Sequence, residues 1–177
     1  MSSFVALLRG INVGTAKRVP MGKLRVMFER LGYTDVATLL NSGNVVFDAS
    51  NGTASKHASA ISAAIRKTFK FDVAVVVRTA SEMKAAVAEN RLARRGTNPS
   101  RLLAAFGQLA ALKPIKKTLA TGERFVIGRR AAYMYLPAGM ARSKAGNALL
   151  ASPGLTTRNW ATVLKLVDLL DGRSTRE

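Results

Sequence analysis

The order of apolar segments along the chain sets the strongest limit on its fold. A short apolar run at Val5–Leu8 precedes a helical pattern over 20–32, and two β-type runs flank a turn signal at 41–44. A helical face then covers 53–69, "FDVAVVVR" is a valine-rich strand, and another helix follows at 81–89. This order of strand, helix, strand, strand, helix, strand and helix predicts a split βαβ unit of ferredoxin-like type.

The same order returns after the polar, basic stretch "NRLARRGTNPS", which we interpret as a linker. "RLLAAFG" resembles a strand, "QLAALKPIKKTL" a helix or helix pair interrupted near Pro114, and "RFVIGRRAAYMYL" a hairpin. "ARSKAGNALLAS" is helical, "LTT" is a candidate short strand, and "RNWATVLKLVDLL" is a final helix. In "TTRNW" we expect Thr156 or Thr157 to cap that helix, Arg158 to lie in its first turn, and Trp160 to be core.

Two registers align the halves. Gly10 falls on Gly107 at the ends of the first strands, whereas Phe47 falls on Tyr135 in a register that is nine residues shorter. An insertion the length of 11–19 in the first half accounts for the difference, although apolar residues also match by chance. We therefore predict an α/β (α+β) chain formed by tandem duplication of two ferredoxin-like βαββαβ-type subdomains. The predicted boundaries are 1–90 for the first half, 91–100 for the linker and 101–177 for the second half.

Composition excludes several classes of protein. A chain of 177 residues that is 48% hydrophobic is long and apolar enough to bury a core. It has neither an apolar run of about 18 residues nor a secretory leader pattern at its start, so we expect a cytoplasmic protein that does not bind membranes. The absence of cysteine excludes disulfides, thiolate zinc sites and cysteine nucleophiles.

The net charge of +18 favours anionic partners, with nucleic acid as the first candidate. The charge is densest in the middle of the chain, where backbone contacts to RNA or DNA would fall on Arg91, Arg94, Arg95, Lys113, Lys116 and Lys117. A solvated basic surface without a specific partner explains the same composition.

The loop in "LLRGINVGTAKRVPM" is the first candidate site. Its glycines are spaced G-x-x-x-G, which matches neither the P-loop nor the dinucleotide-binding pattern. Gly10 and Gly14 nonetheless permit positive φ, and Pro20 prepares a helix start whose dipole favours an anion. Arg9, Lys17 and Arg18 add positive charge. The alternative is an ordinary strand-to-helix connection in which Asn12 makes a local turn bond.

Two further polar stretches join this hypothesis. The hairpin tip "NSGN" suits a tight turn, yet Asn41 and Ser42 would add donors and acceptors if the tip lies beside the first loop. In "GMARSKAGNALL" the cations Arg142 and Lys144 precede or start a helix, where the macrodipole disfavours them unless an anion bridges them. A solvent-facing cationic turn is the alternative.

General acid–base catalysis has few candidate groups. His57 is the single histidine, and we expect it to be exposed at a polar helix start. The ten acids are scattered, no metal-ligand cluster is visible, and no cofactor motif is present. We therefore favour a binding protein over an enzyme, with no catalytic residue assigned.

The leading hypothesis is a protein that binds a nucleotide, a phosphorylated metabolite or a nucleic-acid backbone in a polar cleft formed by both halves. The alternatives are a salt-dependent RNA- or DNA-binding protein that uses its basic surface, and an enzyme acting on a phosphorylated substrate. The candidate ligand-binding residues are Arg9, Gly10, Asn12, Gly14, Lys17, Asn41, Ser42, Arg142, Ser143, Lys144, Thr157, Arg158 and Asn159.

Several motifs together resemble the bacterial family called domain of unknown function 1697. They are "ALLRGINVG", "KRVPM", "LRVMFERLGYTDVATLLNSGNVVF", "ARSKAGNALL" and "TTRNWATVLKLVDL", which span the chain from Phe4 to about Leu170. The resemblance implies a cytoplasmic α/β protein of two ferredoxin-like halves. It implies no activity, because none is established for that family.

Overall fold

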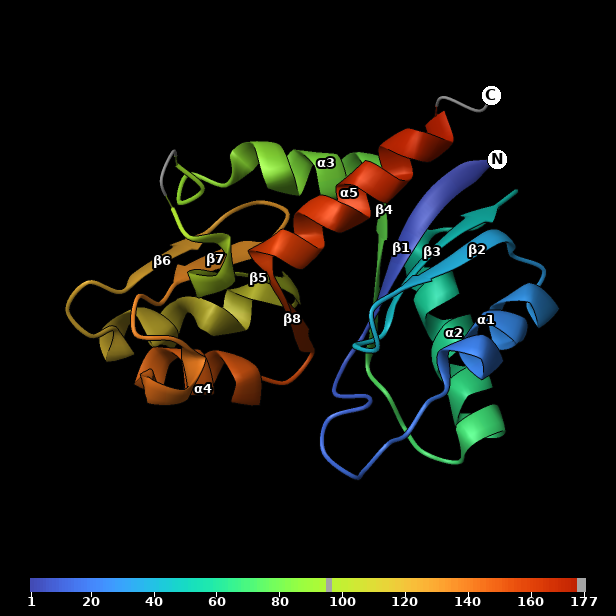
Figure 1. Cartoon of the computed structure of the whole chain (residues 1–177), viewed down its shortest axis with the longest axis horizontal. Helices are drawn as coiled ribbons and strands as arrows, with labels where there is room; N and C mark the ends of the chain where they lie inside the picture. Colours follow the sequence, from blue (N-terminus) through green and yellow to red (C-terminus); the bar gives the residue numbers. More distant parts are fainter. Residues whose placement is uncertain (95–96, 175–177) are drawn as a thin grey trace. The chain divides into compact units, whose positions relative to one another are not determined.

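The computed structural model describes residues 1–94 and 97–174 and contains two four-stranded antiparallel sheets (Figure 1). The first half comprises β1 (Ser2–Leu8), α1 (Met21–Arg30), β2 (Thr34–Leu39), β3 (Asn44–Ala49), α2 (Ala54–Phe69), β4 (Val75–Thr79) and α3 (Ala80–Glu89). The second comprises the 3₁₀ segment η1 (Pro99–Arg101), β5 (Leu102–Gly107), η2 (Leu109–Thr118), β6 (Arg124–Ile127), β7 (Ala132–Tyr135), η3 (Met140–Arg142), α4 (Lys144–Ala151), β8 (Leu155–Asn159) and α5 (Trp160–Ser174).

The two sheets share one topology. Their strand orders are β2-β3-β1-β4 and β6-β7-β5-β8, so the first strand of each half lies between the third and the fourth. This layout is compatible with a duplicated ferredoxin-like fold. None of the described helices is long and apolar enough to cross a membrane.

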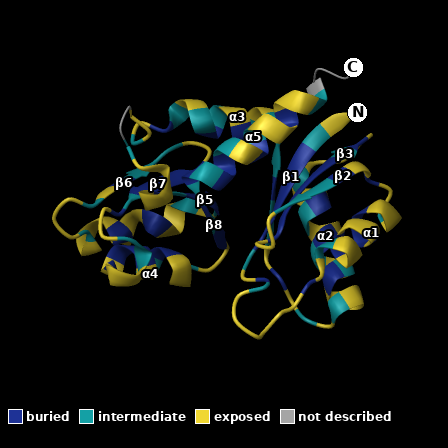
Figure 2. Cartoon of the chain, in the orientation of Figure 1, coloured by how far each residue is buried: buried dark blue, intermediate teal, exposed yellow. Residues whose placement is uncertain are grey.

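The first sheet packs one face against α1 and α2 (Figure 1). Side chains alternate along a strand, so Phe4, Ala6 and Leu8 point to this core while Val5 and Leu7 lie on the other face. All five are buried. Figure 2 shows the same pattern in the helices, which are buried toward the sheet and exposed on the outside. The helical members of the core are Leu24, Met27, Phe28, Ile61 and Ile65.

The second sheet builds a separate core with η2 and α4. Ala105 and Met134 from the strands meet Leu112 and Ile115 from η2 and Leu149 from α4. The segment "QLAALKPIKKTL", predicted as a helix or helix pair interrupted near Pro114, is a run of 3₁₀ turns that contains Pro114.

The helices α3 and α5 belong largely or partly to the other compact unit than the strands β4 and β8 that precede them. From Glu82 onward α3 belongs to the second compact unit, where Ala86 O lies 2.7 Å from the Tyr133 hydroxyl. From Leu166 onward α5 belongs to the first unit, where Arg173 pairs with Asp48 at 3.3 Å. The compact units therefore differ from the predicted halves in the assignment of α3 from Glu82 onward and of α5 from Leu166 onward.

The predicted hairpin around 41–44 and the burial of Trp160 are both confirmed. Two local predictions are wrong. Arg158 lies in β8 rather than in a helix, and Asn159, not a threonine, caps α5 by accepting a hydrogen bond from Ala161 N–H at 3.0 Å. Phe47 corresponds in packing to Met134, because both face their cores. A register shift of one residue onto Tyr135 would turn the side chain to the other face.

Candidate functional site

The loop between β1 and α1 is held in place by the side chain of Asn12. Its Oδ1 accepts from Val19 N–H at 2.8 Å, and its Nδ2 donates to Val19 O at 2.9 Å and to Asn41 O at 2.8 Å. The Asn12 backbone has a φ of +56°, and its N–H donates to Lys17 O at 3.1 Å. Asn12 therefore ties the loop to the β2–β3 turn and places that turn beside the loop. The bonds to Val19 are the local turn bonds expected of an ordinary strand-to-helix connection.

A hollow of about 290 Å³ lies where this loop enters α1. Pro20 is the N-cap of α1, no side chain caps the helix, and its first turn contains no acidic residue. Arg18 is exposed beside the helix start. The lining residues are Asn12, Arg18, Val19, Pro20, Met21 and Asn41. Because first-turn N–H groups and the positive end of the helix dipole face a helix entrance, this hollow is electropositive.

The two glycines of this loop allow backbone conformations with a positive φ. Gly10 and Gly14 have φ values of +65° and +62°, and a Cβ at either position would meet nothing within 4 Å. Sequence reasoning missed a tighter position, Gly43, where a Cβ would lie 2.8 Å from Leu8 Cβ. The "NSGN" pattern signals a turn but does not reveal this packing against β1.

Other predicted residues of the first half lie outside this hollow. Lys17 Nζ donates to Asp72 O at 2.9 Å, and Arg9 N–H donates to Ala74 O at 2.9 Å. Ser42 Oγ accepts from Asn44 Nδ2 at 2.9 Å and so shapes the turn. Arg18, by contrast, lines the hollow; its charge was part of the loop hypothesis, although Arg18 was not among the predicted ligand-binding residues.

The second unit contains the remaining candidates, in two places. Ser143 is buried and its Oγ accepts from Gly146 N–H at 2.9 Å, which makes it the N-cap of α4. Arg142 and Lys144 on either side of it are exposed. The helix start that the sequence predicted at this point is therefore present, with its two cations toward solvent.

The three candidates from "TTRNW" lie along β8. Arg158 is 7% exposed, and its guanidinium donates to Thr156 Oγ1 at 2.7 Å and to Thr157 O at 2.8 Å. Burial lowers the pKa of Arg158 to about 10. Asn159 Nδ2 donates to Ser100 O at 3.1 Å. These contacts fix the strand and its junction with α5.

The prediction that His57 is exposed is wrong. Its ring is 6% exposed and packs edge-on against Phe4, and its Nδ1 lies 3.0 Å from the Tyr33 hydroxyl. Burial lowers the pKa of His57, so the neutral ring is favoured. The helix pattern placed this histidine on α2 correctly, but the sequence did not show that Phe4 and Phe47 gather on that side. Among the described residues, no group of three histidines or acids could hold a metal ion.

Comparison with known proteins agrees with this architecture. The chain is similar in structure to the conserved bacterial protein SP0830 from Streptococcus pneumoniae, with a TM-score of 0.80 and 21% sequence identity over 96% of this chain and 98% of that chain. At that identity the likeness shows the fold alone. No curated protein matches the chain. The family model described as "Protein of unknown function (DUF1697)" matches residues 1–133, and the chain therefore belongs to this family.

Proposed function

We propose that this protein binds an anion, specifically the phosphate group of a nucleotide or a phosphorylated metabolite, in the hollow at the start of α1. The observation that carries the proposal is the lining of that hollow, which combines Arg18 with an α1 N-terminus that has no acidic or capping side chain. Helix N-termini bind phosphates because their first N–H groups lack internal acceptors and the dipole favours negative charge.

The rigidity of the loop supports the same proposal. Asn12 uses its amide to fix Val19 and Asn41, so the walls of the hollow are set before a ligand arrives. A prearranged site loses less conformational entropy on binding. The proposal also includes the finer fold assignment, a duplicated ferredoxin-like unit in which the first copy alone has this polar insertion.

Replacing Arg18 by alanine is expected to weaken binding of inorganic phosphate and of ADP by about tenfold, because a charge-assisted hydrogen bond contributes roughly 1.5–3 kcal/mol. Titration followed by amide chemical shifts is the measurement, with the largest shifts expected at Gly22 and Lys23 in the first turn of α1.

Arg25→Ala is the matched control for this experiment. Arg25 is exposed on the same helix and pairs with Glu29 at 2.9 Å, away from the hollow. Equal weakening by the two variants would reveal diffuse attraction to a basic surface and would contradict the proposal. Shifts confined to residues outside the first turn would contradict it as well.

A second candidate function is salt-dependent binding of nucleic acid. The observation that favours it is η2, where Lys113, Lys116 and Lys117 are all exposed and no acid is present. Arg91 and Arg94 are exposed as well, whereas Arg95 lies outside the described residues.

Alanine at all three η2 lysines is expected to reduce the salt dependence of binding to a single-stranded oligonucleotide. Each lost phosphate contact lowers the slope of log K against log salt by about 0.7. Fluorescence anisotropy at several salt concentrations measures this slope. An unchanged slope, or no salt-sensitive binding by the parent protein, would reject this function.

A further inference from the structure

The terminal strand β4 of the first sheet lies beside a groove. In the sheet order β4 is terminal and pairs with β1. Arg9 N–H donates to Ala74 O at 2.9 Å, which continues the β1–β4 register one residue beyond the Leu8–Val75 pair. Because neighbouring residues of an antiparallel strand direct their backbone groups to opposite sides, Val75 directs its N–H and C=O away from β1.

Side chains already satisfy the outward carbonyls on either side of Val75. Ser62 Oγ donates to Val73 O at 3.1 Å, and Arg78 Nη1 donates to Val77 O at 3.0 Å. Val75 is the residue of β4 between these two whose backbone N–H and C=O point away from β1. The outward-facing backbone groups to which a further strand could bond are therefore centred on Val75.

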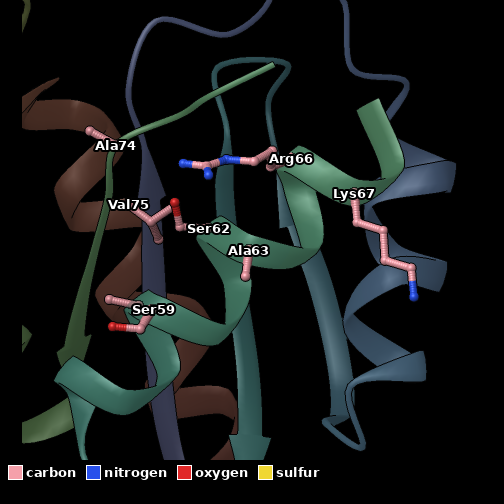
Figure 3. Close-up of a pocket in the computed structure, with 8 residues that line it drawn as sticks. Ser59, Ser62, Ala63, Arg66, Lys67, Ala74 and Val75 are labelled. Carbon is pink, nitrogen blue, oxygen red and sulfur yellow. The ribbon is translucent and has the colours of Figure 1, made fainter. Parts of the chain in front are cut away.

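The groove runs between this edge and α2 and has a volume of about 590 Å³. Small side chains form most of its α2 wall, which leaves room for another chain beside β4. Figure 3 shows Ser59, Ser62 and Arg66 directed from α2 toward the segment of Ala74 and Val75, and Lys67 directed away from it. The lining residues are Ala58, Ser59, Ser62, Ala63, Arg66, Lys67, Ala74 and Val75.

The α2 wall of the groove is basic, because Arg66 and Lys67 are among its lining residues. α2 contains Lys56, Arg66 and Lys67, β4 contains Arg78, and neither element contains an acid. Asp72, in the loop between them, pairs with Arg66 at 2.5 Å, but both side chains are more than 70% exposed. Such an exposed pair contributes little, so an incoming carboxylate can replace it at Arg66.

We propose that this groove binds an extended acidic polypeptide segment, which adds to β4 as a further strand. The backbone of the segment would pair with Val75 N–H and C=O, small apolar side chains on one face would enter the groove, and acidic side chains would reach Arg66. Charge favours an acidic segment over a second copy of this chain, because two chains of net charge +18 would repel each other. A nucleic acid would find no aromatic side chain in the lining on which to stack. The groove is separate from the hollow at α1, and the proposal is independent of phosphate binding there.

The test uses the full chain and a synthetic peptide of alternating glutamate and valine, acetylated and amidated at its ends. Two control peptides are required: one with N-methylated alternate residues, which cannot form the strand hydrogen bonds, and one with lysine in place of glutamate. Binding is followed by amide chemical shifts and by hydrogen exchange at Val75. We expect the first peptide to slow exchange at Val75, and each control peptide to bind at least tenfold more weakly.

Val75→Pro removes the outward N–H without removing a β1–β4 hydrogen bond, and is expected to weaken peptide binding at least tenfold. Ile127→Pro is the matched control, because Gly128 N–H bonds to Ala131 O and Ile127 therefore directs its own N–H away from β7 in another edge strand. Ser59→Trp fills the groove from α2 and is expected to weaken binding equally while leaving β4 unchanged.

Several results would overturn the proposal. Equal binding of the N-methylated peptide would show that no strand is added. An octathymidine that shifts the same amides at equal affinity would identify a nucleic-acid surface instead. Self-association that Val75→Pro abolishes would make a second copy the occupant, and retained binding in Ser59→Trp would place the peptide elsewhere.

Discussion

Alanine at Gly107 is expected to lower the free energy of unfolding by about 3 kcal/mol or more. Gly107 ends β5 with a φ of +129°, and a Cβ there would lie 2.1 Å from the backbone oxygen of Gly154. That oxygen is fixed, because it accepts a hydrogen bond from Gln108 N–H at 3.2 Å. The side chain therefore cannot be accommodated unless β5 and β8 move apart. Urea denaturation followed by circular dichroism measures the loss.

Gly10→Ala is the matched control, because Gly10 follows β1 and also has a positive φ. A Cβ at Gly10 would meet nothing within 4 Å, and only the φ of +65° is unfavourable for alanine. We expect a loss of about 1 kcal/mol from this backbone strain. Losses of similar size at the two glycines would contradict the assignment of a close backbone approach to Gly107 alone.

Glu89→Ala is expected to destabilise the second unit by about 2 kcal/mol. The Glu89 carboxylate accepts from the backbone N–H groups of Arg129, Arg130 and Ala131 at 3.1, 2.9 and 3.2 Å. The Tyr133 hydroxyl lies 2.8 Å from the same carboxylate. Alanine would leave the turn between β6 and β7 without this acceptor, although water can reach part of it. Denaturation followed by the fluorescence of Trp160, which packs edge-on against Tyr133, reports on this unit.

The same carboxylate predicts a dependence of stability on pH. Burial alone would raise the pKa of Glu89, but the hydrogen bonds from Arg130, Tyr133, Ala131 and Arg129 outweigh burial and lower it below its ordinary value of 4.5. A carboxyl group whose pKa is lower in the folded state stabilises the protein above pH 4.5, and this contribution is lost as the pH falls toward the folded-state pKa.

Glu89→Gln is the control for that pH dependence, because it keeps the shape of the side chain and removes its titration. The difference in unfolding free energy between the parent and Glu89→Gln is expected to be largest near pH 7 and to shrink toward pH 3. A difference that stays constant over this range would contradict the role of the ionised carboxylate.

Much of the fold was accessible from apolar periodicity. The hairpin at 41–44 and the helix over 53–69 were predicted because their patterns are long and their turn residues are distinctive. β8 was harder, since "TTRN" lacks an apolar alternation and Arg158 is buried through contacts with Thr156 and Thr157. The 3₁₀ geometry of η2 was missed because its apolar spacing also fits an α-helix.

Some features of the candidate site were predicted from the sequence, and others were shown only by the structure. The loop composition indicated Asn12 and a helix start at Pro20, and the structure adds that Asn12 reaches Asn41, far along the chain. No local pattern could have placed Lys17 on Asp72 or buried His57 beside Tyr33, because these contacts depend on the packing of α2.

The sequence by itself determined the order of the elements, the positions of the main turns and the two-sheet architecture, because backbone propensity and apolar spacing act over a few residues. Only the tertiary structure decided which polar groups are used internally and which face solvent. The Glu89 carboxylate accepts hydrogen bonds from a turn 40 residues away, and a backbone oxygen packs against Gly107 where a Cβ would stand. Each depends on distant segments meeting within a few ångströms, and that distance is set by the packing of whole elements.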